Sequence, residues 1–454
     1  MNERVVILGG GESGTGAAIL AKAKGFDVFV SDQGQLKDHY RQDLITAGIA
    51  FEEGGHSEEK VLSATLVIKS PGIPKKTDIV KKAKAKKIPI IDEIEFACRY
   101  VKGKIIAITG TNGKTTTTLL TYHLLKTAGF NVALAGNVGE SLARKVATAE
   151  YDWYVLEISS FQLDGTKKFH PHIGILLNIT PDHLDRYDHK MANYVNSKFK
   201  LIKNMTSRDY FVYFLDDKIS GEEARQRSTE AYRVEISLDH EAITSAHFDG
   251  KKMTFQFGKK KFKIAQSETT LKGVHNLVNT MAAVSAAYLA KVPDTAIREG
   301  LKTFKNAPHR LESVATIHGV EFVNDSKATN VDSVIYALGS YDQPLIWIAG
   351  GTDKGNDYNQ IREEVKKKVK TLICLGKDNT KLKTFFSPLL PKVMETQDVK
   401  SLVRMALAAA RPGDVVLLSP ACASFDLFKN YMDRGDQFRE AVLQLKEEKE
   451  NVNA

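Results

Sequence analysis

Residues 110–116 of the chain, Gly-Thr-Asn-Gly-Lys-Thr-Thr, combine glycine, lysine and hydroxyl groups in the manner of a phosphate-binding loop. The apolar run before them is typical of a buried strand, and a helical pattern starts at Lys114. Backbone N–H groups at such a helix start bind anions, the lysine supplies charge for the terminal phosphates, and Thr115 can offer its hydroxyl to Mg²⁺. Only Thr111 and Asn112 separate the two glycines, which is shorter than the general G-x-x-x-x-G-K-[ST] spacing. An ordinary strand–turn–helix is therefore the alternative.

Three side chains further along the chain could act on a bound phosphate. Glu157 falls at the carboxyl end of a predicted strand, where open α/β sheets bind ligands, and its carboxylate could ligate Mg²⁺. His183 lies in the run Asp-His-Leu-Asp-Arg that follows the next predicted strand, and Lys198 lies on a predicted helix. Taken alone, His183 is more typical of a structural hydrogen-bonding residue and Lys198 of a surface lysine.

Residues 4–32 follow the pattern strand, glycine loop, helix, strand. Gly9, Gly11 and Gly14 satisfy G-x-G-x-x-G, and Asp32 comes after the second predicted strand, near the place of a ribose-binding acid. NAD is the simplest interpretation. The fingerprint is weak evidence for NAD, however, because any diphosphate can bind at the same helix N-terminus.

The C-terminal third of the chain holds three polar loops that each follow a predicted strand. They are residues 324–330, residues 350–354 and residues 419–426. The strands alternate with helical patterns, which predicts a doubly wound sheet. Loops at the carboxyl ends of its strands predict a binding site at that edge.

A chain of 454 residues should form about three domains, since single cores stop growing well below that size. We predict an α/β fold with a Rossmann-like parallel sheet over residues 1–93, a central P-loop-type ATPase α/β domain over 94–305, and a Rossmann-like domain over 306–454. A β-hairpin is predicted around Gly258-Lys259 in the central domain.

Composition argues against several classes of protein. The net charge of +9 could suit nucleic acid, but much of it lies in lysine runs typical of solvated helix faces, and no basic stretch alternates with stacking aromatic residues. No apolar run approaches the ~18 residues of a membrane span. The sequence enters a strand at once, which leaves no room for a secretory signal, and the scattered cysteines indicate a reducing compartment. We therefore expect a cytoplasmic protein with no nucleic-acid or membrane partner.

Taken together, these motifs resemble the Mur ligase family over essentially the whole chain. Gly-Thr-Asn-Gly-Lys-Thr-Thr is similar to the family's short phosphate loop, and residues 182–186 with Lys198 are similar to its second metal region. The loops at 324–330 and 419–426 resemble the branch that adds D-glutamate to UDP-N-acetylmuramoyl-L-alanine. The Asp-Asn-Pro-Arg run of the diaminopimelate- or lysine-adding branch does not occur in the sequence.

The resemblance implies a ligase of cytoplasmic peptidoglycan synthesis, expected to be a monomer. ATP would activate the carboxylate of the UDP-substrate as an acyl phosphate, and the amine of D-glutamate would displace the phosphate. Because two anions meet in the first step, Lys114 and two Mg²⁺ ions would screen them. By the same resemblance, Thr115 and Glu157 hold one ion, and His183, Glu157 and a carbamylated Lys198 hold the other.

The resemblance also implies the remaining contacts, which fall into four groups. The catalytic group is Lys114, His183, Lys198 and Lys327. The ATP group is Gly110, Thr111, Asn112, Gly113, Lys114, Thr115, Thr116, Asn276, Asn279, Arg310 and Asp325. The UDP-substrate group is Glu12, Ser13, Gly14, Asp32, Ser70 and Asn137. The D-glutamate group is Thr329, Lys354, Ser424, Phe425 and Tyr431. The departure is Glu12, which puts a carboxylate in a loop meant to meet a diphosphate.

Other functions stay open at this point. A sister ligase for another amino acid, or a folylpolyglutamate-type ligase, would share the ATP chemistry. An NAD-dependent oxidoreductase would use the first glycine loop but would leave residues 110–116 and Glu157 without a role. A nucleotide-switch GTPase is disfavoured, because the chain carries no Asn-Lys-x-Asp motif.

Overall fold

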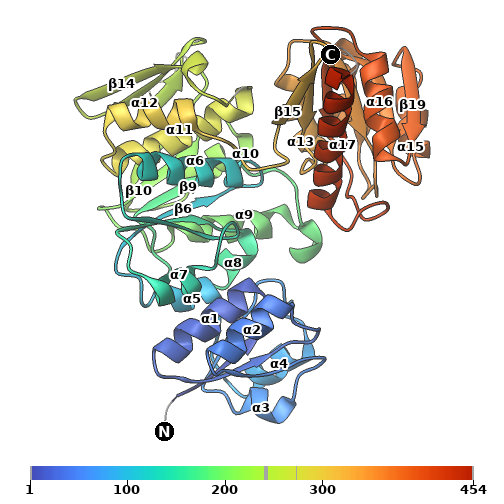
Figure 1. Cartoon of the computed structure of the whole chain (residues 1–454). Helices are drawn as coiled ribbons and strands as arrows, with labels where there is room; N and C mark the ends of the chain where they lie inside the picture. Colours follow the sequence, from blue (N-terminus) through green and yellow to red (C-terminus); the bar gives the residue numbers. More distant parts are fainter. Residues whose placement is uncertain (1–2, 240–243, 272, 452–454) are drawn as a thin grey trace. The chain divides into compact units, whose positions relative to one another are not determined.

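The computed structural model describes residues 3–239, 244–271 and 273–451. By its internal contacts the chain forms two compact units, Met1–Thr270 with Val278–Phe304, and Leu271–Leu277 with Lys305–Ala454. Within the described residues the first unit holds two sheets and the second unit holds one (Figure 1). These three mainly parallel sheets with their helices confirm the predicted fold class. None of the helices in these ranges is long and apolar enough to cross a membrane.

The N-terminal sheet places three loops at one edge. Its strand order is β3-β2-β1-β4-β5, and its pairs are parallel. The residues of β1 alternate between two apolar clusters, so this apolar strand is buried on both faces. Leu8, the last residue of β1, pairs with Ser31 and with Lys69, which brings the loops after three strands together. The elements are β1 (Arg4–Leu8), α1 (Glu12–Ala23), β2 (Asp27–Ser31), α2 (Asp38–Thr46), β3 (Ala50–Glu52), α3 (Glu58–Leu62), β4 (Leu66–Lys69), α4 (Asp78–Ala85), β5 (Ile90–Ile91) and α5 (Glu93–Ala97).

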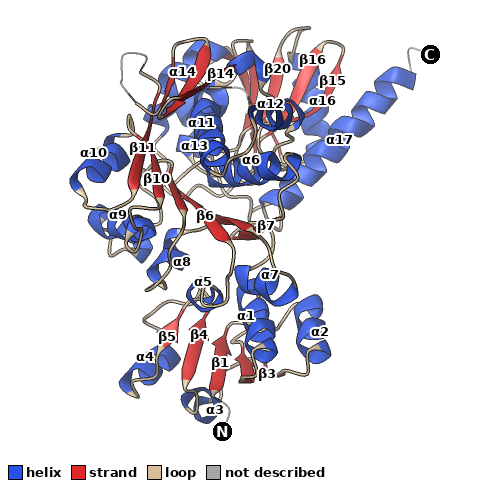
Figure 2. Ribbon diagram, turned by 90° about the vertical axis from the view of Figure 1, so that its left-hand side faces the viewer, coloured by secondary structure: helices blue, strands red, loops and turns tan. Residues whose placement is uncertain are grey.

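The central sheet has the order β14-β13-β12-β11-β10-β9-β6-β8-β7. It is parallel from β7 to β12, and β11, β10, β6 and β7 follow one another across it in Figure 2. Phe257 pairs with Lys260 in the antiparallel pair β13–β14, which confirms the predicted hairpin. The strands are β6 (Lys104–Thr109), β7 (Val132–Gly136), β8 (Trp153–Glu157), β9 (Ile173–Leu176), β10 (Tyr210–Phe214), β11 (Tyr232–Ser237), β12 (Ala246–Phe248), β13 (Lys252–Phe257) and β14 (Lys260–Ala265). The helices are α6 (Lys114–Thr127), α7 (Leu142–Thr148), α8 (Ser160–Asp164), η1 (Leu184–Arg186), α9 (Met191–Phe199), η2 (Lys200–Ile202), α10 (Lys218–Gln226), η3 (Gln266–Glu268), α11 (Val274–Leu289) and α12 (Asp294–Thr303).

The sheet of the second unit has the order β15-β16-β20-β17-β18-β19. Strand β15 pairs antiparallel with β16, and the other described pairs are parallel. Strand β17 is apolar throughout because Leu345 and Trp347 enter one core cluster while Ile346 and Ile348 enter the other. The elements are β15 (Glu312–Ile317), β16 (Val320–Asn324), α13 (Val331–Gly339), β17 (Leu345–Ala349), η4 (Tyr358–Ile361), α14 (Arg362–Lys368), β18 (Val369–Leu375), α15 (Thr380–Phe386), β19 (Lys392–Thr396), α16 (Val399–Ala409), β20 (Val415–Leu418) and α17 (Tyr431–Asn451).

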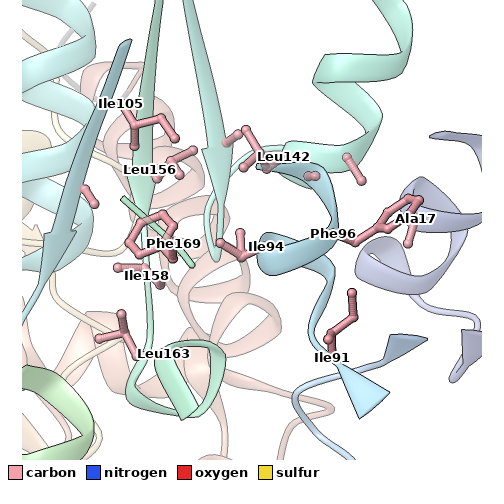
Figure 3. Packing of buried hydrophobic residues seen from close by; sticks show 14 of the residues in the cluster. Ala17, Ile91, Ile94, Phe96, Ile105, Leu142, Leu156, Ile158, Leu163 and Phe169 are labelled. Atoms are coloured by element: carbon pink, nitrogen blue, oxygen red, sulfur yellow. The ribbon is translucent and has the colours of Figure 1, made fainter. Parts of the chain in front are cut away.

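Helix α5 joins the two sheets of the first unit through a shared apolar core. Ile94 and Phe96 are fully buried in a cluster that includes Ala17 of α1 and Ile105 of β6. Figure 3 shows Phe96 beside Ala17 and Ile94 on the side of Phe169. The two sheets are therefore not separated by a polar linker, and α5 belongs to the packing of both.

Helix α5 also carries a buried carboxylate, Glu93. Its Oε1 accepts a hydrogen bond from the backbone N–H of Ala143 at 2.6 Å, whereas its Oε2 has no hydrogen-bond partner among the described residues. Burial raises the pKa of Glu93 to about 8. The hydrogen bond from Ala143 opposes that rise in pKa, and the charges of Asp92 and Glu12 add to it. A carboxyl group in this position is more stable as the neutral acid.

We predict that Glu93 makes the stability of the first unit depend on pH. Because its pKa is raised on folding, its stabilising contribution is complete below the unfolded value of 4.5 and is lost as the pH rises through about 8. Between about pH 5 and pH 9, Glu93→Gln should therefore lose less melting temperature than the wild type in scanning calorimetry. Glu150→Gln, at an exposed carboxylate, is the control. Equal losses in Glu93→Gln and the wild type would contradict the assignment.

Candidate active site

The predicted phosphate loop connects β6 to α6 and turns at Gly113. This residue is the N-cap of α6 with φ of 84°, a conformation that favours glycine. A Cβ at this position would lie 2.2 Å from Oδ1 of Asn279, so α11 packs directly on the loop. Asn279 also accepts a hydrogen bond from Oγ1 of Thr117 at 3.2 Å. The predicted ATP-site residue Asn279 therefore lies against the start of α6.

The loop is held from the other side by Asn178, which follows β9. Its Oδ1 accepts hydrogen bonds from the backbone N–H groups of Thr111 at 3.1 Å and Asn112 at 2.8 Å. Its Nδ2 donates to the carbonyl oxygen of Asn112 at 3.1 Å. One amide side chain thus fixes both donors and an acceptor of the loop. The N–H groups of Thr111 and Asn112 point toward Asn178, so anion binding falls to the first turn of α6, where helices bind phosphate.

Two lysine side chains converge on the carbonyl oxygen of Gly110. Nζ of Lys114, from the first turn of α6, lies 2.9 Å from this oxygen and 2.8 Å from that of Thr111. Nζ of Lys198, from α9, lies 2.7 Å from the same Gly110 oxygen. The expectation of a surface position for Lys198, taken alone, is wrong, because its side chain is almost completely buried.

The surroundings of Lys198 favour the neutral amine. Burial lowers the pKa of Lys198 well below its usual value, the charge of Lys114 lowers that pKa further, and Asp182 opposes the shift. The ammonium position lies 4.7 Å from the ring centre of Tyr194, whose hydroxyl is 3.2 Å from Oγ1 of Thr111. Lys198 and Tyr194 on α9 therefore both reach the phosphate loop.

Glu157, the last residue of β8, is a buried carboxylate with one partner. Its Oε1 accepts a hydrogen bond from Nδ2 of Asn137 at 2.7 Å. Its Oε2 is buried and has no hydrogen-bond partner in the part of the chain that the structure describes. A buried carboxylate oxygen left in this way suits a cation. No group of three or more His, Cys, Asp and Glu side chains in the described ranges could hold a metal ion by itself.

His183 begins the short helix η1 with φ of 53°, in the left-handed region. Its side chain is about half exposed, and its Nε2 lies 3.5 Å from Oδ2 of Asp182. The ring meets that of Phe161 edge-on at 5.2 Å. In this arrangement His183 packs on Phe161 of α8, and within the described part of the chain its ring makes no hydrogen bond or ion pair with Glu157.

A cavity of about 520 Å³ opens beside this region, between the loop after β4 and helices α8 and α9. Its charged lining residues are Lys69, Lys75, Lys76, Arg186 and Lys200 together with the acidic Asp164, Asp185 and Asp188. The residues that define its two sides are Lys69, Pro71, Phe161, Arg186, Asn193 and Lys200. Arg186 stacks over the ring of Phe161 at 4.6 Å.

Two of the residues predicted to bind the UDP-substrate, Asp32 and Ser70, form hydrogen bonds to the backbone of the first glycine loop. Oδ2 of Asp32 accepts a hydrogen bond from the backbone N–H of Gly10 at 2.6 Å, and Oδ1 accepts one from Gly34 at 2.7 Å. Oγ of Ser70 donates to the carbonyl oxygen of Gly9 at 3.2 Å. Asp32 and Ser70 therefore come together at the loop, as their positions at one sheet edge predict, and their side chains brace its backbone.

Glu12, at the start of α1, uses its carboxylate elsewhere. The two oxygens accept hydrogen bonds from Ser141 and Arg144 at the start of α7. A negative charge is unfavourable beside a diphosphate, and the carboxylate of Glu12 is instead bound by the first residues of α7.

In the second unit, the three predicted polar loops follow β16, β20 and β17, which are neighbouring strands. The buried guanidinium of Arg434, from α17, ties them together. It donates to Oγ and the carbonyl oxygen of Ser326 at 2.9 Å each, to the carbonyl oxygen of Cys422 at 3.2 Å and to that of Gly350 at 3.3 Å. One side chain thereby fixes the backbone of all three loops.

Two of these loops are also joined to each other. Thr352 and Ala423 form an antiparallel bridge with N–H···O distances of 2.8 Å and 3.1 Å. The bridge brings the predicted D-glutamate residues Lys354 and Ser424 onto adjacent segments. Phe425 is 68% exposed and Lys354 is exposed, whereas Ser424 is buried.

The loop after β20 is anchored at its first residue. The indole N–H of the fully buried Trp347 donates to the carbonyl oxygen of Ser419 at 2.8 Å, and Oγ of Ser419 donates to Oδ2 of Asp325 at 2.9 Å. Burial raises the pKa of Asp325 to about 7, while hydrogen bonds from Ser419 and Leu311 and the charges of Arg310 and Arg434 oppose the shift.

The other predicted residues of this unit lie around the same edge. Nζ of Lys327 lies 5.1 Å from the ring centre of Tyr431, and the backbone N–H of Thr329 donates to the carbonyl oxygen of Lys327 at 3.0 Å. Asn276, on the first turn of α11, is buried and groups with this unit, whereas Asn279 groups with the first unit.

The sequence matches three families that together span most of the chain. They are described as Mur ligase MurD-like N-terminal domain over residues 3–92, Mur ligase middle domain over 108–287, and Mur ligase glutamate ligase domain over 309–422. A protein of Cytophaga hutchinsonii named UDP-N-acetylmuramoylalanine–D-glutamate ligase is 50% identical over 450 residues, which are 98% of this chain and all of that protein. A Bacteroides fragilis protein of the same name is 49% identical over 98% of this chain and all of its own length.

The chain belongs to the Mur ligase family.

Its fold agrees with solved Mur ligase structures. UDP-N-acetylmuramate-alanine ligase MurC from Thermotoga maritima is similar with a TM-score of 0.64 and 17% identity, over 98% of this chain and all of that one. At this identity the likeness shows the fold alone.

Sequence reasoning missed the residues that hold the site's loops in place. Asn178 has one weak signal, since it stands directly after a predicted strand at the edge where ligands bind. Arg434 and Arg144 have no local signal, because both lie in helical patterns where arginine is typical of a solvated face.

We predict that Asn178 sets the affinity of this Mur ligase for ATP. Asn178→Ala removes three hydrogen bonds to the loop, each worth about 1 kcal/mol, and should raise the KM for ATP at least about tenfold. The KM values of the other substrates should change little. Asn204→Ala is a matched control, because Asn204 also donates to two backbone carbonyls of the same sheet's connections but lies away from the loop. Equal effects of Asn178→Ala on all substrates would instead indicate a general loss of structure.

Proposed function

We propose that this chain is an ATP-dependent ligase that joins D-glutamate to UDP-N-acetylmuramoyl-L-alanine in the cytoplasmic stage of peptidoglycan synthesis. The observation that carries the proposal is the identity of 50% over 98% of the chain with a ligase of that printed name. The basic phosphate loop with Lys114 and the neighbouring buried Glu157 supply the chemistry that such a reaction needs.

The reaction must activate a carboxylate. A carboxylate is a poor acyl donor at neutral pH, so we propose that its oxygen attacks the γ-phosphorus of ATP, with ADP leaving and an acyl phosphate formed. The amine of D-glutamate then attacks the acyl carbon, inorganic phosphate leaves and an amide bond remains. Lys114 stabilises the first step by placing a positive charge where two anions approach each other.

The proposed nucleotide-binding residues start with the phosphate loop. Gly110 to Thr116 meet the phosphates, and Asn276 and Asn279 face the adenine side. Arg310, Asp325 and Lys327 serve the nucleotide from the C-terminal domain, with Lys327 and His183 in catalytic roles. In this proposal the domains are residues 1–93 for the UDP-substrate, 94–305 for ATP and 306–454 for the amino acid.

The residues near the phosphate loop fit magnesium. When bound, Mg²⁺ would neutralise charge on the phosphates. We propose that Thr115 and Glu157 hold one ion, because Oε2 of Glu157 is buried without a hydrogen-bond partner among the described residues. A second ion would be held by Glu157, His183 and a carbamylated Lys198. The low pKa of Lys198 supports this, because only a neutral amine reacts with CO₂.

The proposed UDP-substrate site is the first glycine loop with Ser13, Gly14, Asp32 and Ser70, and its muramoyl arm reaches Asn137. The hydrogen bond from Asn137 to Glu157 would connect that arm to the metal. For D-glutamate we propose Thr329, Lys354, Ser424, Phe425 and Tyr431, with the ammonium of Lys354 bound to a carboxylate of the amino acid. We further propose a monomer with no nucleic-acid partner.

The amino-acid dependence of ATP turnover tests the function. With UDP-N-acetylmuramoyl-L-alanine present, phosphate release should require D-glutamate and should be absent with L-glutamate, L-lysine or meso-diaminopimelate. Lys114→Ala should abolish the turnover while leaving the melting temperature unchanged. Turnover with another amino acid, or with a folate in place of the UDP-substrate, would assign the chain to a sister activity.

The carbamate has its own test. Lys198→Ala should lose nearly all activity and recover part of it with added acetate, because acetate can replace the missing carboxylate. Lys203→Ala, at an exposed lysine on the next turn, should retain wild-type activity. Carbon-13 NMR with labelled bicarbonate should show a carbamate signal in the wild type that Lys198→Ala lacks. Full activity in Lys198→Ala would refute the carbamate.

A further inference from the structure

An acidic residue, Glu12, lies in the loop that the proposed function assigns to a diphosphate. Glu12 is the first residue of α1, directly after Gly11, the N-cap of the helix. A Cβ built on Gly11 meets no atom of the described residues within 4 Å, so this side of the loop is open. The Cα atoms of the two residues are about 3.8 Å apart. A freely rotating Glu12 side chain could therefore bring its carboxylate to the open face of the loop.

The start of helix α7 binds this carboxylate instead. Oε1 of Glu12 accepts hydrogen bonds from N–H and Oγ of Ser141 and from Nε of Arg144, each at 2.9 Å. Oε2 accepts one from the second guanidinium nitrogen of Arg144 at 3.1 Å. The pair is bidentate and mostly buried, with 14% of the Arg144 side chain and 27% of the Glu12 side chain exposed. Such a pair keeps one geometry.

The charge of Glu12 persists in this position. Burial alone would raise the pKa of Glu12, but hydrogen bonds from Arg144 and Ser141 outweigh it and leave the pKa below its usual value. The remaining guanidinium nitrogen of Arg144 binds Asp43 of α2 at 2.9 Å. Arg144 thus pairs with acidic groups from two helices, Glu12 of α1 and Asp43 of α2.

The packing of α1 on α7 is built for this contact. A Cβ on Gly16, one turn after Glu12, would lie 2.0 Å from Oγ of Ser141. Only a glycine allows the two helices to approach so closely. Ser141 is the N-cap of α7, so the carboxylate of Glu12 also meets the positive end of that helix.

We propose that Arg144 is a positioning residue for the UDP-substrate, because it binds the carboxylate of Glu12 and so keeps a negative charge out of the space that the diphosphate occupies. This inference rests on the proposed function of the first glycine loop. It predicts that the loss caused by removing Arg144 is electrostatic and disappears when Glu12 is also neutral.

A double-mutant cycle tests the inference. Arg144→Met keeps much of the buried volume and should raise the KM for UDP-N-acetylmuramoyl-L-alanine about tenfold, with kcat and the KM for ATP unchanged. The increase should shrink at high salt. Glu12→Gln with Arg144→Met should return the KM to within about twofold of Glu12→Gln alone. Calorimetric binding of UDP to the same four proteins gives a readout that does not depend on turnover.

Two outcomes overturn the inference. One is an unchanged KM in Arg144→Met. The other is a loss that persists in the double variant, which would mean that Arg144 acts only in packing α1 against α7.

A steric variant separates this failure from a failure of the proposed site. Gly11→Val fills the open side of the loop without strain, since Gly11 has φ of −74°, and should raise the KM for the UDP-substrate. Gly339→Val, at another glycine with no described atom within 4 Å of an added Cβ, is the control. If Gly11→Val binds UDP normally, the substrate does not use this loop, and both proposals fail. If only Arg144→Met is silent, the charge inference alone fails.

Discussion

Two lysine amines share one carbonyl oxygen at the phosphate loop of the first unit, and this contact limits the positive charge that the loop can hold. Lys114 and Lys198 both donate to Gly110, and they come from helices on different parts of the central sheet. Two ammonium groups at one buried oxygen repel each other, so the structure favours one charge there rather than two. Lys114 is the more exposed of the two, and its charge lowers the pKa of Lys198. Burial and the charge of Lys114 favour the neutral amine of Lys198, and its proposed conversion to a carbamate would turn that amine into an anionic metal ligand.

The sequence predicts well those features that depend on residues close together in the chain. The apolar strand before Gly110, the helix that starts at Lys114 and the strand that ends at Glu157 follow from local patterns and from the rule that parallel strands end at one edge. The fold class follows in the same way. These features need only the order of residues along one element.

What the sequence does not predict depends on contacts between distant segments. Asn178 bonds to Asn112 at a separation of 66 residues, and Arg144 bonds to Glu12 at a separation of 132. The sequence presents Glu12 as an obstacle to a diphosphate, and only the packing of α1 on α7 gives it another partner. Arg434 and the burial of Lys198 are of the same kind, because a helical pattern does not say which of its charged residues faces a neighbour.

The buried Trp347 is an intrinsic fluorescent probe for the loop of residues 419–426. The chain has two tryptophans, and Trp153 lies at the partly exposed start of β8, whereas Trp347 is fully enclosed and bonded to Ser419 at the root of residues 419–426. Indole fluorescence responds to the partner of its N–H group and to nearby water. With Trp153 replaced by phenylalanine, the indole emission of Trp347 alone would report on the base of that loop as amino acids are added.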